Sequence, residues 1–178
     1  MRYLFLQRPF IDRFVPESFR QIAGEHVRRW GIAYLLLIVG AALFQAHFGF
    51  GLNASPSLQY RFFLIHKGEL PQRGDYVAFR WPGGGPYPAG VTFVKIIAGM
   101  AGDTVTRADR DFFVNGMNVG QAKAVSRHGV PLELGPTGVL PAGRYYVRAP
   151  HADSLDSRYR LTGWVSEEQI IGRAYALF

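Results

Sequence analysis

Three residues of this sequence have side chains that could together cut a peptide bond: Ser55, Ser57 and Lys95. Lys95 lies within the stretch VTFVKIIAG, where an ammonium ion is disfavoured, so its pKa should fall and its neutral amine should become available as a base. A serine hydroxyl is a weak nucleophile and needs such a base. Each residue also has an ordinary structural interpretation. Lys95 could project into water from a half-buried strand, and the serines could form a polar turn.

The composition excludes several other kinds of chemistry. The chain has 178 residues and no cysteine, so thiolate nucleophiles, thiolate metal sites and disulfides are ruled out. Its five histidines show no paired ligand spacing, and we expect neither a metal nor another cofactor. The net charge of +7 is spread along the whole chain, which does not favour nucleic-acid binding.

One apolar segment near the N-terminus predicts a membrane span. No Lys, Arg, Asp or Glu occurs between Arg29 and Arg61, and residues 30–44 read WGIAYLLLIVGAALF. A helix of about 20 residues crosses a bilayer core of about 30 Å. We therefore predict an N-terminal segment over 1–29, a transmembrane helix over 30–52 and a further domain over 53–178. A buried helix of a soluble domain or a cleaved signal peptide fits less well, because 29 residues precede the apolar run.

The charges that flank this segment predict its orientation. Six basic residues precede it: Arg2, Arg8, Arg13, Arg20, Arg28 and Arg29. Only three acidic residues accompany them, so the positive-inside rule places the N-terminus in the cytoplasm. The sequence therefore predicts a single-pass protein of the inner membrane whose remaining residues form a periplasmic domain.

After the apolar segment, the pattern changes to short strands separated by Gly- and Pro-rich turns. The predicted strands are rich in β-branched and aromatic residues: YRFFLIH, DYVAFRW, VTFVKIIAG, DTVTRA, DFFVNGMNV, RYYVRA and QIIGRAYAL. Asn115-Gly116 is the favoured pair for a two-residue hairpin turn. We expect a mostly-β domain that follows a single N-terminal helix.

Four segments, in this order, resemble the boxes of the type I signal peptidases, the S26 family of serine proteases with a Ser-Lys dyad. The segments lie between residues 53 and 159: NASPSL, QRGDYVAF, TFVKIIAGMAGD and SLDSRY. The resemblance implies a signal-peptidase-like β-sheet domain, with Ser57 as the nucleophile and Lys95 as its general base. It also implies that the Ser55 hydroxyl and the Ser57 backbone N–H stabilise the oxyanion.

The last box carries three further residues to which the resemblance assigns supporting roles. Ser154 matches the position that hydrogen-bonds the lysine amine, and Asp156 and Arg158 match an ion pair behind the dyad. A polar turn with a surface salt bridge is the alternative interpretation of these three residues.

Within the family, this chain is most similar to the conjugative-transfer peptidases. The similarity lies in the sequence motif N-x-S-x-S-L, the single span and the short length. That subgroup implies maturation of a membrane-tethered pilin precursor for type IV secretion, by cleavage or by cyclisation. Some features depart from the family pattern, such as Gln59-Tyr60 after Leu58 and Met100-Ala101 in the lysine box. Two other functions stay open: a general signal peptidase, and a non-catalytic assembly protein of a secretion apparatus.

Overall fold

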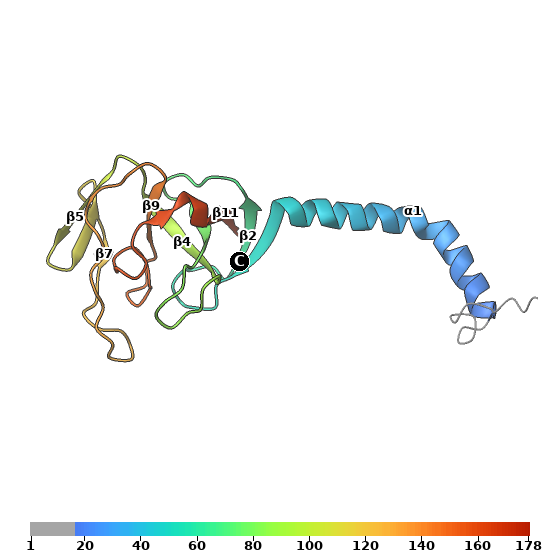
Figure 1. Cartoon of the computed structure of the whole chain (residues 1–178), viewed down its shortest axis with the longest axis horizontal. Coiled ribbons are helices and arrows are strands. Elements are labelled where there is room, and N and C mark those ends of the chain that lie inside the picture. Colours follow the sequence, from blue (N-terminus) through green and yellow to red (C-terminus); the bar gives the residue numbers. More distant parts are fainter. Residues whose placement is uncertain (1–16) are drawn as a thin grey trace, which may run out of the picture. The chain divides into compact units, whose positions relative to one another are not determined.

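The structure, a computed structural model, describes residues 17–178 (Figure 1). It divides into two units, Met1–Gln45 and Ala46–Phe178. The first unit contains all but the last two residues of the helix α1 (Glu17–His47), and the second contains all the strands. The predicted cytoplasmic segment 1–29 therefore lies partly outside the described residues, as do Arg2, Arg8 and Arg13.

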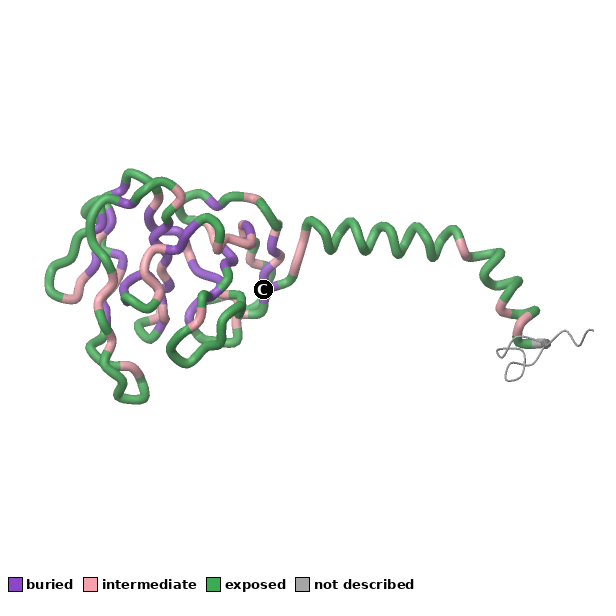
Figure 2. The backbone as a smooth tube through the Cα atoms, viewed as in Figure 1, coloured by how far each residue is buried: buried purple, intermediate pink, exposed green. Residues whose placement is uncertain are grey.

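Helix α1 is long and apolar enough to span a membrane. Its segment Phe19–His47 has 29 residues and contains an 18-residue window with a mean hydropathy of 1.6, and none of that window is buried within the protein (Figure 2). At about 1.5 Å per residue, this segment exceeds the thickness of a bilayer core. Exposed apolar side chains along a long helix are those expected of a lipid-facing helix.

The observed helix does not coincide with the predicted transmembrane range 30–52. The helix begins earlier, at Glu17, because charged residues are compatible with a helix that continues beyond the apolar segment. It ends at His47, and residues 48–52 (FGFGL) form strand β1 instead. Two glycines and two phenylalanines in five residues lower the helix propensity. The strand pairs with β2 and belongs to the unit that starts at Ala46.

The second unit consists of two antiparallel sheets and the short 3-10 helix η2 (Glu167–Gln169) (Figure 1). The seven-stranded sheet has the order β1-β2-β11-β3-β4-β9-β10, and the four-stranded sheet has the order β7-β6-β5-β8. The strands of the first sheet are β1 (Phe48–Leu52), β2 (Phe62–Lys67), β3 (Tyr76–Arg80), β4 (Thr92–Gly99), β9 (Arg144–Arg148), β10 (Val165–Ser166) and β11 (Ile170–Ala176). The strands of the second are β5 (Thr104–Ala108), β6 (Asp111–Val114), β7 (Met117–Gln121) and β8 (Gly138–Val139).

The mostly-β fold predicted from the sequence is confirmed, and each predicted strand segment contains an observed strand. The Asn115-Gly116 turn joins β6 to β7, and both residues have the positive φ that this hairpin turn requires. Strands β1, β8 and β10 were not predicted from the sequence. The last two have only two residues each, too few to show an alternating pattern.

Strand β4 lies inside the larger sheet, between β3 and β9, with core on both of its faces. Val94 belongs to one buried cluster, which also contains Leu58, Phe63 and Ala149. Ile97 belongs to another, which contains Val77 and Val147. Because side chains alternate along a strand, Lys95 shares the face of Ile97 and must enter an apolar layer.

A buried carboxylate fixes the connection between the two sheets. Asp103 lies between β4 and β5 and accepts hydrogen bonds from Arg73, Asn115 and the backbone N–H of Met100, at 2.6–2.8 Å. Although burial raises the pKa of Asp103, these donors hold that pKa below its ordinary value. Two of the segments that carry the resemblance, QRGDYVAF and TFVKIIAGMAGD, are therefore joined here by an ion pair between Arg73 and Asp103.

Candidate active site

The candidate nucleophile lies in a short loop between β1 and β2. Backbone hydrogen bonding from Asn53 N–H to the carbonyl of Arg61 closes this loop at 2.8 Å. Pro56 and Ser57 occupy a turn inside it, and Ser57 is 5% exposed. The next residue, Leu58, packs in the same apolar cluster as Val94 of β4. The loop is therefore held against the strand that carries Lys95.

The two serine hydroxyls of this loop are in direct contact. Ser55 Oγ lies 2.9 Å from Ser57 Oγ, and both are within hydrogen-bond distance of Asn53 Oδ1. In the described part of the chain, the backbone N–H of Ser57 has no hydrogen-bond partner, and Pro56 carries no N–H. The Ser57 N–H and the Ser55 hydroxyl are thus two donors on the same short segment.

Lys95 is buried in the middle of β4 and is 6% exposed. Val77 lies opposite Lys95 on β3. The Nζ atom of Lys95 is 5.5 Å from the centre of the Phe93 ring. Among the residues that the structure describes, none forms a hydrogen bond or an ion pair with this amine. Burial lowers the pKa of Lys95 from 10.5 to about 8. A substantial part of the amine is therefore neutral near pH 8.

A buried ion pair lies within electrostatic reach of Lys95. Arg158 Nε is 2.8 Å and its Nη2 is 2.9 Å from the two carboxylate oxygens of Asp156, and both side chains are almost fully buried. Asp156 favours the charged form of Lys95 and Arg158 opposes it, so the pair changes the pKa of Lys95 less than burial does. The surface salt bridge considered as an alternative does not describe this pair, because the pair is buried.

Asp156 and Arg158 are also tied into the backbone around them. Asp156 accepts a hydrogen bond from the backbone N–H of Ala149, at the end of β9. Arg158 donates to the carbonyls of Gln121, His151 and Ser154. Since a buried pair is costly unless its remaining hydrogen-bonding groups are satisfied, this network fixes the whole segment in place.

Ser154 is buried beside this network, but its Oγ has no hydrogen-bond partner among the described residues. The predicted hydrogen bond from Ser154 to the lysine amine is therefore not present in this structure. Ser57 Oγ and Lys95 Nζ do not share a hydrogen bond either; the Ser57 hydroxyl contacts Ser55 and Asn53 instead. Catalytic hydrogen bonds are often long in an unliganded enzyme and shorten when substrate binds.

Asn53 is part of the motif NASPSL, but no role was predicted for its side chain from the sequence. A sequence signal did exist, because Asn two residues before Ser is typical of a turn in which the Asn side chain accepts a backbone hydrogen bond. The structure shows this contact between Ser55 N–H and Asn53 Oδ1, at 3.4 Å.

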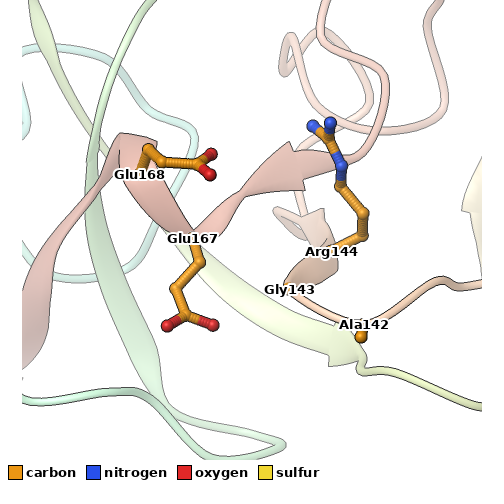
Figure 3. Close-up of a pocket in the computed structure, with 5 residues that line it drawn as sticks. All are labelled: Ala142, Gly143, Arg144, Glu167 and Glu168. Atoms are coloured by element: carbon orange, nitrogen blue, oxygen red, sulfur yellow. The ribbon is translucent and has the colours of Figure 1, made fainter.

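A surface pocket elsewhere in the domain contains none of the proposed catalytic residues. It is lined by Ala142, Gly143, Arg144, Glu167 and Glu168 (Figure 3). The Arg144 guanidinium and the Glu167 carboxylate point to opposite sides of it (Figure 3). Within residues 17–178 there is also no cluster of His, Asp and Glu that could hold a metal ion.

Replacement of Lys95 by Met should stabilise the protein at neutral pH. The unfolded chain binds the lysine proton with a pKa of 10.5 and the folded chain with a pKa of about 8, so folding disfavours the ammonium below about pH 8. This difference corresponds to as much as about 3 kcal/mol. Thermal unfolding of the full chain in detergent at pH 7 should therefore give a higher Tm for Lys95→Met.

The exposed Lys123 supplies the control, because Lys123→Met should give no such gain. In the native protein, stability should rise between about pH 8 and 10.5, where the unfolded state binds more protons. A lower Tm for Lys95→Met at pH 7 would show that the ammonium is well accommodated.

Comparison with known proteins identifies the family. The family model of the signal peptidases, peptidase S26, matches residues 23–178. Signal peptidase I of Pseudomonas fluorescens is 29% identical over 177 residues, which cover 80% of this chain and 60% of that protein. Signal peptidase I T of Bacillus subtilis (strain 168) is 31% identical over 169 residues, which cover 84% of this chain and 83% of that protein.

A crystal structure of a signal peptidase I from Enterococcus faecalis V583 has 25% sequence identity and a TM-score of 0.39; the match covers 62% of this chain and 98% of that one. The chain spans 60% and 49% of the length of two Pseudomonas relatives, and about four fifths of the length of the Bacillus relatives. The family match extends over most of the chain and includes every residue of the candidate site. The chain therefore belongs to the signal peptidase family, peptidase S26, a family of serine endopeptidases.

Proposed function

We propose that this protein is a membrane-anchored serine endopeptidase that removes signal peptides from exported precursors, with Ser57 as nucleophile and Lys95 as general base. The observation that carries the proposal is the buried amine of Lys95, whose pKa is lowered to about 8. The loop of Ser57 packs through Leu58 against Val94, on the other face of the same strand. Such an amine has little structural value, since burying it costs stability. As a base, it removes the need for a histidine.

The reaction follows from the donors and acceptors of the site. Neutral Lys95 accepts the proton of Ser57 as its Oγ attacks the carbonyl carbon of the scissile peptide bond. The Ser57 N–H and the Ser55 hydroxyl donate hydrogen bonds to the oxyanion that forms. The protonated Lys95 then gives its proton to the leaving amine as the C–N bond breaks, and an acyl-enzyme remains. Water, activated by the neutral lysine, releases the second product.

Helix α1 supports an assignment to the membrane, and the charge distribution supports an orientation. Arg20, Arg28 and Arg29 lie on the N-terminal side of the most apolar residues. By the positive-inside rule, the N-terminus is cytoplasmic and the β domain lies on the opposite side of the inner membrane. Protease added to intact spheroplasts should then digest the domain, whereas digestion only after lysis would reverse this assignment.

A narrower candidate substrate is a pilin precursor of a conjugative system. The sequence N-x-S-x-S-L at residues 53–58 and the single apolar helix favour it. The acyl-enzyme of Ser57 could then transfer the pilin to water or to the pilin's own amino group, which would give a linear or a circular product. Each reaction breaks the same Ser57 ester, and mass spectrometry separates the two, because the circular product is lighter by one water.

The Ser57→Ala and Lys95→Ala variants should both leave precursors uncut. The first lacks the nucleophile and the second lacks the base, so each should reduce processing by several orders of magnitude. Purified full-length enzyme in detergent would be incubated with a signal-peptide precursor and, in parallel, with a pilin precursor. Matched controls are Ser126→Ala, at a half-buried serine outside the site, and Lys123→Ala, at an exposed lysine. Normal cleavage by either dyad variant would refute the mechanism; an inactive wild-type protein would favour the assembly role.

The Ser55→Ala variant should slow cleavage by about 10²-fold, the usual effect of removing one oxyanion donor. The loss should appear in kcat with KM little changed, because the donor acts on charge that develops only in the transition state. Steady-state kinetics on a precursor peptide measures both constants. An unchanged kcat would mean that the Ser55 hydroxyl does not stabilise the oxyanion.

A further inference from the structure

One amide side chain contacts both serine hydroxyls of the candidate site. Asn53 Oδ1 lies 3.0 Å from Ser55 Oγ and 3.3 Å from Ser57 Oγ, and these two oxygens are 2.9 Å apart. The proposed nucleophile, the proposed oxyanion donor and the amide oxygen thus form a closed triangle. Asn53 is half-buried at the start of the loop, immediately after strand β1.

The orientation of this amide is fixed by its other end. Asn53 Nδ2 donates a hydrogen bond to the backbone carbonyl of Tyr60, at 3.2 Å. A carbonyl oxygen can only accept, so the NH2 group must face Tyr60 and Oδ1 must face the serines. The backbone N–H of Asn53 bonds to the carbonyl of Arg61 at the same place. The side chain is therefore held between the two ends of the loop.

The triangle contains three contacts but only two protons. Each serine hydroxyl has one proton, and Oδ1 has none to give. Only two of the three contacts can be hydrogen bonds at any moment, so a proton is readily redirected. When Ser57 gives its proton to a base, Ser55 can still donate, and when Ser55 donates to an oxyanion, no buried donor is left unpaired.

We propose that Asn53 is a positioning residue of the catalytic site, which acts through Ser55 and Ser57 by means of its Oδ1. Before substrate binds, Oδ1 holds both hydroxyls in the orientations that the structure shows. During the reaction, each hydroxyl exchanges Oδ1 for a reacting partner: Ser57 gives its proton to Lys95, and Ser55 donates to the oxyanion. This inference rests on the proposed function, since it assigns Asn53 to that same reaction.

Two variants separate this role from mere closure of the loop. Asn53→Asp keeps the acceptor oxygen but loses the donor to Tyr60, whereas Asn53→Leu has a similar size and loses both. If the acceptor matters, Asn53→Leu should lower kcat by about 10²-fold with KM little changed, because misplaced catalytic groups cost about that much. Asn53→Asp should retain most of the wild-type kcat.

The comparison should use the alkaline plateau of each pH profile. The new carboxylate of Asn53→Asp favours the ammonium form of Lys95, which displaces the profile to higher pH without lowering the plateau. Tm values measured in the same detergent show how much each variant disturbs folding. Gln59→Ala, in the same loop, is the matched control, because Gln59 is exposed and forms no hydrogen bond within the described residues.

The outcomes distinguish a failure of this inference from a failure of the proposed function. Equal losses of kcat in Asn53→Leu and Asn53→Asp would assign Asn53 to loop closure alone. A wild-type kcat in Asn53→Leu would show that Asn53 has no role in catalysis. Both results overturn the inference. Either could occur while Ser57→Ala and Lys95→Ala remain inactive, which leaves the proposed function intact. If those two variants cleave normally, the proposed function itself fails.

Discussion

The free-energy cost of burying Lys95 is the constraint on which the rest of the site depends. Its amine lies in an apolar layer between β3 and β9, and it has no ion pair or hydrogen bond in the described residues. A protein keeps such a group when the neutral amine has a use, because methionine would fill the same space at lower cost. The surrounding strands must supply the stability that this one residue removes.

The polar groups around Lys95 are placed so that they do not restore its pKa to the ordinary lysine value. Asp156 alone would favour the ammonium, but Arg158 neutralises it at 2.8 Å. The pair therefore fixes the segment beside Lys95 without restoring the charge on the lysine. At the nucleophile, Asn53 and the two serines form a neutral cluster, so no charge there favours the ammonium either. Burial remains the main cause of the lowered pKa.

The sequence allowed the strands, the apolar helix and the family to be predicted, because each depends on local patterns or on residue order. The end of the helix was placed too late, since FGFGL is as apolar as a membrane segment and only its pairing with β2 makes it a strand. The orphan hydroxyl of Ser154 and the burial of the Asp156–Arg158 pair depend on contacts between distant segments. The triangle around Asn53 depends on loop geometry that no spacing rule specifies.

The pH dependence of kcat/KM tests the central claim most directly, because this ratio reports the pKa values of the free enzyme. A precursor peptide without groups that titrate between pH 6 and 10 would be used with the full-length enzyme. If neutral Lys95 is the base, activity should rise with pH and reach its midpoint at about 8, the pKa of Lys95 in the structure. A midpoint near 10.5, the ordinary lysine value, or a rate independent of pH would contradict this account.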